Sequence, residues 1–186
     1  MKRSPVPITS QRELYERALR LLTQKSRSQW ELRRLLAKRC CEQSLVTAVI
    51  DKCIAHGYLD DVQYAIHLAR DHAERKRHGR RRVAQELRAR GLSAPIVELA
   101  LQEMFSQVDE GAVLRRAVQA RVRNTPGKWD TRKKKKLYDQ LVRAGFDTDA
   151  ILRELRRHQI SMTVESDTVP AEEAEFSPGS SEEEPV

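Results

Sequence analysis

The chain has 186 residues, of which 35 are Lys or Arg and 27 are Asp or Glu; 39% are apolar and 5% aromatic. No segment is apolar over the roughly 18 residues that span a bilayer, and no apolar segment follows the N-terminus as in a signal peptide. Three cysteines, none in a Cys-x-x-Cys pair, predict neither a disulfide framework nor a zinc site. We expect a helical, basic, cytoplasmic protein.

Acidic side chains gather at the C-terminal end. The segment from Gln159 to Val186 holds eight acidic residues and no Lys or Arg, so residues 1–158 hold all 35 basic and the other 19 acidic residues, a formal charge of +16. Because a segment rich in Glu, Ser and Pro cannot bury enough apolar surface, we predict a disordered tail over 159–186 and a flexible N-terminus over 1–10. The tail either covers a basic surface and competes with DNA or is a solvated extension; the sequence favours neither.

From residue 11 onward, apolar residues recur at helical spacing. Three successive helix faces are marked by Leu14, Ala18, Leu21 and Leu22, by Leu32, Leu35 and Leu36, and by Leu45, Val46, Val49, Ile50, Cys53 and Ile54. Ser28 and Ser44 are candidate N-caps of the second and third helices, and Gly57 is a candidate C-cap. Residues 11–57 therefore read as a three-helix unit.

The same unit returns twice. The segments 36–40, 87–91 and 141–145, which begin at Leu36, Leu87 and Leu141, superpose as three equivalent helix ends. Apolar positions on both sides follow in register, so we predict an all-α fold of nine helices in three tandem repeats, over 11–57, 58–107 and 108–158. Each unit has a thin core and should pack on its neighbour, which gives an elongated array that can curve.

The link between the first two repeats carries local signals. Gly57 can adopt the left-handed conformation that ends a helix, Asp60 can cap the next helix, and Leu59 can pack on Tyr64 as a hydrophobic staple. A metal site or acid/base pair at Asp60 and Asp61 would lack a third ligand or a nearby His. We interpret both acids as structural.

The residues of the second repeat resemble the RecX family of regulators of the recombinase RecA. The resemblance rests on Gly57, Tyr58, Leu59, Asp60, Asp61, Tyr64 and Ala65, and on Gly79, Arg80, Arg81, Arg82, Val83, Glu86, Leu87 and Gly91. The first and third repeats also fit, over about residues 11–158. Cys40 departs from the pattern because the other repeats have Gly there, and the acidic extension after His158 lies outside it.

The resemblance implies an all-helical protein that binds in the groove of the RecA filament on single-stranded DNA. It further implies inhibition of strand exchange, ATP hydrolysis and co-protease activity through binding alone, without a cofactor. We expect a monomer, because no large apolar stripe is left over, with weak non-specific affinity for DNA.

Two basic clusters are candidate binding residues. They occupy equivalent positions at the start of a second helix, and comprise Arg75, Lys76, Arg77, Arg80, Arg81 and Arg82 around Gly79, and Arg132, Lys133, Lys134, Lys135 and Lys136. Positive charge there opposes the helix dipole, so local stability does not explain it and an anionic partner does. A solvated surface that keeps the protein soluble is the alternative.

A general DNA-binding protein and an enzyme are the two other classes of function. A general DNA-binding protein resembling helix-turn-helix domains would act through phosphate contacts, and Gln85, Arg88 and Arg90 on one helix leave base contacts open. An enzyme is disfavoured because no phosphate loop, nucleophile elbow or zinc-binding His motif occurs, so we expect no catalytic and no metal-binding residues. Trp30 and Trp129 are interpreted as anchors between helices.

Overall fold

The computed structural model describes residues 8–125 and 127–160, and these fold into nine α-helices and one short π-helical segment without a strand. The all-α prediction is confirmed. None of the described helices is long and apolar enough to cross a membrane. The expectations for residues 1–7 and 161–186 lie outside the described part.

The first unit contains α1 (Gln11–Gln24), α2 (Gln29–Ala37) and α3 (Gln43–Ala55). The second contains α4 (Asp61–Arg70), continued by the π-helical η1 (Asp71–Arg75), then α5 (Arg80–Ala89) and α6 (Ala94–Gln107). The third contains α7 (Glu110–Arg123), α8 (Thr131–Arg143) and α9 (Thr148–Arg157).

Each unit has its own apolar core. The cores are centred on Leu14, Leu36 and Ile50 in the first unit, on Val83, Leu87 and Leu101 in the second, and on Leu141, Phe146, Ile151 and Leu155 in the third. Ile8 and Ile160 are buried in the first and third cores, although both lie in ranges that we expected to be flexible or disordered. Burying an isoleucine removes enough apolar surface from water to order these few residues.

The ends of α2 and α3 test the predicted caps. Ser28 and Glu31 form a capping box, with the Glu31 amide 3.1 Å from the Ser28 hydroxyl. The prediction for Ser44 is wrong: Glu42 is the N-cap residue of α3, and the Ser44 hydroxyl, one residue inside the helix, donates to the Glu42 carboxylate over 2.7 Å. Serine competes for local hydrogen bonds at several positions of a first turn, so its presence alone does not fix the cap.

The link between α3 and α4 confirms two of three expectations. Gly57 has a φ of +72°, and the Asp60 carboxylate accepts hydrogen bonds from the amides of Val62 and Gln63. The predicted staple is wrong, because Leu59 is buried in the first core while Tyr64 packs against the second. Leu59 thus belongs to the core of the first unit, although it directly precedes the N-cap residue of the second unit's first helix.

The end of α2 differs in backbone conformation from the equivalent ends of α5 and α8, which explains why Cys40 stands there instead of glycine. Gly91 and Gly145 end α5 and α8 with φ values of +74° and +85°, whereas Cys40 is not among the residues with positive φ. The Cys40 amide instead donates to the Leu36 carbonyl over 3.0 Å, and its side chain is buried. Because no left-handed residue is needed at this helix end, a side chain is tolerated.

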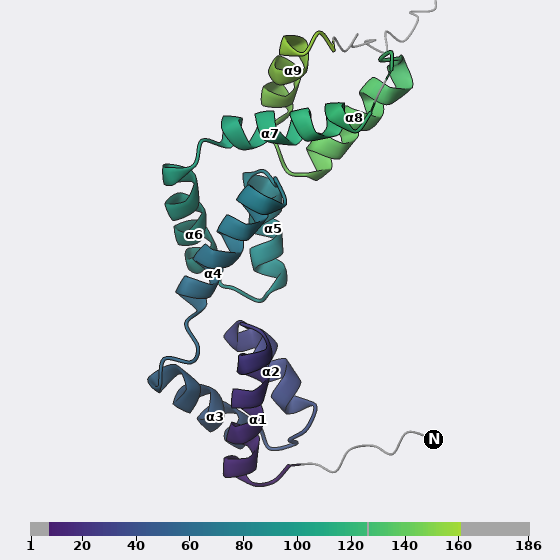
Figure 1. Ribbon diagram of the computed structural model, residues 1–186. Helices are drawn as coiled ribbons and strands as arrows, with labels where there is room; N and C mark the ends of the chain where they lie inside the picture. Colours follow the sequence, from purple (N-terminus) through teal and green to yellow (C-terminus); the bar gives the residue numbers. More distant parts are fainter. Residues whose placement is uncertain (1–7, 126, 161–186) are drawn as a thin grey trace, which may run out of the picture.

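The three units stack into a curved column (Figure 1). The second helix of each unit, α2, α5 and α8, lies along the concave inner edge of this column, while α3 and α6 lie along the outer edge. One face of the molecule is therefore built from three equivalent helices.

Candidate binding face

The joint between the first two units fixes the start of α2 against the end of α5. The Ser28 hydroxyl donates to the Arg90 carbonyl over 2.5 Å, and the Arg90 guanidinium pairs with Glu31 over 2.7 Å. The Gln29 amide, at the first residue of α2, donates to the Asp61 carboxylate over 2.9 Å. An acid of the second unit thus caps a helix of the first.

Glu31 is the polar centre of this first joint. Burial alone would raise its pKa, but hydrogen bonds from Arg90, the Ser28 amide and the Tyr64 hydroxyl outweigh burial and lower the pKa. Burial and the neighbouring Glu31 carboxylate raise the pKa of Tyr64 to about 12, so its hydroxyl stays a donor at neutral pH. A half-buried network of this kind, in which Glu31 accepts all three hydrogen bonds, orients two units relative to each other.

The joint between the second and third units repeats this plan with other residues. The Gly79 amide donates to the Ala144 carbonyl over 2.8 Å, and the Arg81 amide to the Gly145 carbonyl over 3.3 Å. The Arg80 amide, at the first residue of α5, donates to the Glu110 carboxylate over 2.8 Å. Asp61 and Glu110 are each the first residue of a unit's first helix, so the capping acid is equivalent in both joints.

Close packing at the joints depends on glycine. A side-chain carbon at Gly91 would overlap the Trp30 indole, and one at Gly145 would overlap the backbone of Arg82. Trp30 remains 40% exposed, and the Arg34 guanidinium lies 4.5 Å from its ring centre. This placement between two units agrees with the interpretation of Trp30 as an anchor.

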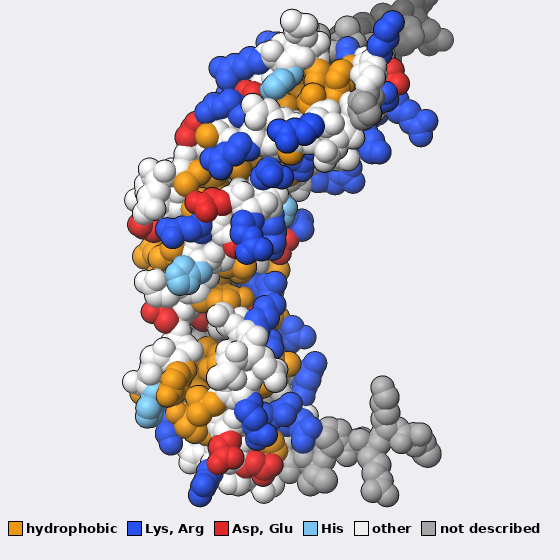
Figure 2. Space-filling view, viewed as in Figure 1, with side chains coloured by type: hydrophobic (Ala, Val, Ile, Leu, Met, Phe, Trp, Pro, Cys, Tyr) orange, Lys and Arg blue, Asp and Glu red, His pale blue; other side chains and the backbone are white. Residues whose placement is uncertain are grey.

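A hollow opens beside each joint, between the second helices of adjoining units. The first joint hollow has a volume of about 300 Å³ and is lined by Arg27, Trp30, Glu31, Arg34, Leu35, Lys38, Ala89 and Arg90. The second joint hollow has a volume of about 840 Å³ and is lined by His78, Arg81, Arg82, Gln85, Arg121, Gln140, Val142, Arg143, Ala144 and Gly145. Lys and Arg side chains follow the inner edge past both (Figure 2).

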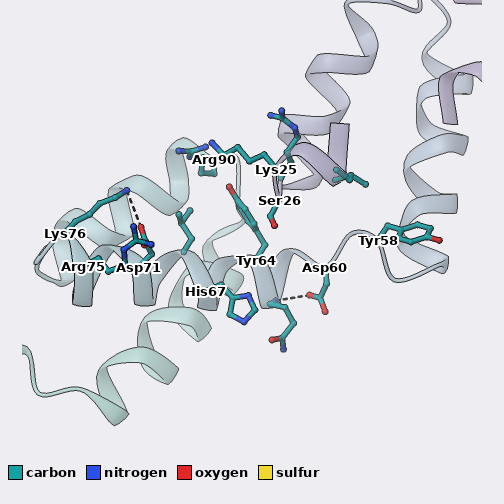
Figure 3. A pocket seen from close by; sticks show the side chains of 14 residues that line it. Lys25, Ser26, Tyr58, Asp60, Tyr64, His67, Asp71, Arg75, Lys76 and Arg90 are labelled. Atoms are coloured by element: carbon teal, nitrogen blue, oxygen red, sulfur yellow. Dashed lines mark hydrogen bonds and ion pairs between the residues drawn. The ribbon is translucent and has the colours of Figure 1, made fainter. Parts of the chain in front are cut away.

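A third hollow of about 720 Å³ lies between the end of α1 and the α4–η1 helix (Figure 3). Its basic side chains are mostly engaged: Arg75 and Lys76 contact Asp71 at 3.0 and 3.6 Å, and Arg90 pairs with Glu31. Tyr64 lies between Arg90 and Ser26 in this view. Three of the five Lys and Arg side chains that line this hollow are thus paired with an acid.

Comparison with known proteins identifies the relatives of this chain. The family models described as the first and second three-helix domains of RecX match residues 15–53 and 60–101. Regulatory protein RecX of Mycobacterium tuberculosis is 33% identical over 151 residues, which cover 76% of this chain and 84% of that protein. The chain belongs to the RecX family.

Other RecX proteins match over different lengths. The one from Pelodictyon phaeoclathratiforme is 30% identical over 139 residues and 84% of its length. The one from Vibrio campbellii is 38% identical over 88 residues, so this chain spans about half (56%) of that relative. All three relatives are named regulatory proteins.

Solved RecX structures share the fold. RecX from Lactobacillus salivarius superposes with a TM-score of 0.67 over 81% of this chain and 97% of that one, at 18% identity. A second structure, named regulatory protein RecX, superposes with a TM-score of 0.62 over 75% of this chain and 68% of that one, at 22% identity. The predicted array of three-helix repeats is therefore confirmed as a RecX fold.

The structure divides the first predicted basic cluster of this RecX protein. Arg75 and Lys76 lie at the end of η1 beside Asp71, while Arg77, with a φ of +56°, lines a small hollow with Arg116 and Arg123. Arg80, Arg81 and Arg82 begin α5 at the second joint, where Arg80 pairs with Glu98 and Arg81 with Asp147. These six residues thus face several directions.

The other predicted residues are spread along the inner helices. Arg88 is exposed on α5, whereas Arg90 is committed to the first joint. Arg132, Lys133, Lys134, Lys135 and Lys136 occupy the first two turns of α8, beyond the second joint hollow. Sequence reasoning missed Arg121 and Arg143, because each stands outside a basic run.

Proposed function

We propose that this RecX protein binds in the groove of the RecA filament on single-stranded DNA and inhibits strand exchange, ATP hydrolysis and co-protease activity. Family membership supports the regulatory role. The single observation that carries the choice of surface is that three equivalent helices lie along the inner edge, where Lys and Arg side chains gather (Figures 1 and 2).

The joints suit a protein that contacts several filament subunits at once. Hydrogen bonds at both joints and the half-buried Arg90–Glu31 ion pair at the first hold each unit against the next, so the inner edge is presented at a defined curvature. A rigid array can bias the filament between states only if it binds one state more tightly than the other. Occupying the groove would also exclude a second DNA molecule and protein substrates. No covalent chemistry is needed.

The experiment is a titration of this protein into RecA filaments on single-stranded DNA while ATP hydrolysis and strand exchange are recorded, beside a titration of the same DNA without RecA. We expect inhibition at concentrations well below those that coat bare DNA. Inhibition that appears only as the bare DNA becomes saturated would instead assign the protein to the second candidate, a general DNA-binding protein, which the cationic second joint hollow favours.

A further inference from the structure

We propose that the second joint hollow is a binding site for the phosphodiester backbone of nucleic acid, read without regard to base sequence. The described residues that line it include four arginines, Arg81, Arg82, Arg121 and Arg143, together with His78, and no acid. The four arginines come from α5, α7 and α8, so one bound strand would contact two units across their joint.

The two joint hollows can be compared with each other, because they lie at equivalent positions of successive repeats. Where the first has Trp30 and Glu31 on α2, the second has Arg81 and Arg82 on α5. Where the first has Ala89, the second has Arg143. The shared architecture explains why a hollow exists at each joint, but it does not explain why only the second exchanges its acid for positive charge.

Ion pairs show the same divergence. In the first joint the Arg90 guanidinium is neutralised across the joint by Glu31. In the second joint the position of Arg90 is taken by Ala144 and that of Glu31 by Arg82, which pairs within its own helix with Glu86 over 2.6 Å. The second joint also has an ion pair across it, between Arg81 and Asp147 at 3.4 Å, but both of these side chains are exposed. Among the described residues Arg121 and Arg143 pair with no acid, so their like charges favour an anion bound in the second joint hollow.

The arginines are also held in place. Arg121, which is partly buried, donates to the Ala117 carbonyl over 3.0 Å, and Arg143 donates to the Asp139 carbonyl over 3.1 Å. A guanidinium has five N–H donors in a planar fork, so one bond to the helix leaves donors that can contact a phosphate. Fixing the fork beforehand reduces the entropy lost on binding.

The chemistry of the lining favours nucleic acid over an acidic protein segment. Peptide sites depend on apolar or aromatic anchors in a packed centre, and this hollow offers only Val142 and Ala144. Apart from the His78 imidazole, none of the described residues that line it is aromatic, so the hollow has no Phe, Tyr or Trp surface on which bases could stack and the contacts go to phosphates. Arg77, which precedes His78 in the chain, lines another hollow of about 350 Å³ together with Arg116 and Arg123.

This inference deepens the proposed function, because filament DNA would meet the same inner edge, and it is tested on DNA alone so that the two can fail separately. The probe is a fluorescein-labelled single-stranded oligonucleotide, and its affinity is measured by anisotropy at several salt concentrations. The test variant is Arg121→Gln with Arg143→Gln. The matched control is Arg12→Gln with Arg20→Gln, which removes the same charge from exposed positions of α1.

We expect the test variant to bind the oligonucleotide about tenfold more weakly than the control at low salt, since charge-assisted hydrogen bonds are among the stronger ones. The slope of log affinity against log salt should fall by about 1.4, or about 0.7 for each lost phosphate contact on a single strand. Circular dichroism should show equal helicity. Equal affinities of folded test and control variants would overturn the proposal.

Three further probes separate the sources of the anion. An oligonucleotide with an uncharged methylphosphonate backbone should bind both variants equally weakly. Inorganic phosphate or polyglutamate should displace the labelled strand from wild type only at much higher charge concentration than an unlabelled strand. If inorganic phosphate competes equally well, the hollow takes free phosphate, and if polyglutamate does, it takes acidic protein; either result overturns the assignment to nucleic acid.

Discussion

At the scale of single residues, Gly145 shows how closely the second and third units approach. Its φ is +85°, and its α-carbon faces the backbone of Arg82 without room for a side chain. Gly57 has a similar φ of +72° but no atom within 4 Å of the position that a side-chain carbon would take. A side chain at Gly57 would therefore cause backbone strain alone, whereas a side chain at Gly145 would also disturb the contact between two units.

We predict that Gly145→Ala lowers the free energy of unfolding more than Gly57→Ala does. Both variants force alanine into the left-handed region, at a cost of about 1–2 kcal/mol. Gly145→Ala also displaces Arg82 and should lose at least about 1 kcal/mol more, as overpacked sites do. Urea denaturation measures the free energy of unfolding of both variants. Equal losses would contradict the prediction, because they would mean that the second joint accommodates the extra side-chain carbon at no cost in stability.

His72 and His78 form a second residue-scale feature, beside the second joint. Their Nδ1 atoms lie 3.2 Å apart, and the Lys76 ammonium lies 2.7 Å from His72 Nε2. Since Lys76 can only donate, His72 Nε2 accepts, and His72 Nδ1–H donates to His78. Burial, reinforced by these neighbouring positive groups, lowers the pKa of both imidazoles below 6.5.

This network predicts a loss of stability in mild acid. Because both pKa values are lowered in the folded state, the unfolded chain binds protons more readily. The stabilising contribution is complete above about pH 6.5, the ordinary value, and is lost as the pH falls through the lowered values. Urea denaturation from pH 7.5 to 5 should show this decline, with a shallower decline in His78→Asn. Identical slopes would exclude the pair as its cause.

At the scale of helices, the joints exchange caps between units. Asp61 follows Asp60, which caps its own helix, but Asp61 caps α2 of the preceding unit through the Gln29 amide. We predict that Asp61→Ala lowers the free energy of unfolding by about 1 kcal/mol, the usual value of an N-cap, while Asp61→Asn, which keeps an acceptor oxygen, loses little. Thermal and urea denaturation of the two variants measure the effect; a similar loss in both would assign it to charge instead of capping.

The helices could be predicted from sequence, whereas the joints could not. Apolar spacing and a shared helix end at Leu36, Leu87 and Leu141 were enough to predict three-helix units, because these signals are local. The contacts of Gln29 with Asp61 and of Gly79 with Ala144 join residues far apart in the chain, and no local sequence pattern predicts such contacts. For the same reason the predicted packing of Leu59 on Tyr64 was wrong.

The candidate site was predicted only in outline. Runs of Lys and Arg pointed to the inner helices, but isolated residues such as Arg121 and Arg143 complete the second joint hollow. The repeat alignment contained one usable signal, the change from Glu31 to Arg82 at equivalent positions. Its meaning depends on which side chains meet across the joint, which the alignment does not contain.

At the scale of the whole molecule, charge on the inner edge should govern binding to the filament. We predict that Lys135→Gln with Lys136→Gln, at exposed positions of α8 away from the joints, weakens binding to RecA filaments and reduces its salt dependence at unchanged helicity. Arg12→Gln with Arg20→Gln again serves as the control. Co-sedimentation with filaments measures both variants, and equal binding would remove the start of α8 from the interface.

The most direct test of the central claim, that the inner edge meets the filament, is site-specific photocrosslinking. A benzophenone is placed at Lys38, which directly follows α2, or at Gln85 on α5, or else at Asp51 or Gln102 on α3 and α6 of the outer edge. With RecA filaments on single-stranded DNA, we predict crosslinks to RecA or DNA from the inner positions and few from the outer ones. Equal crosslinking from both edges, or crosslinks from the outer edge alone, would contradict this account.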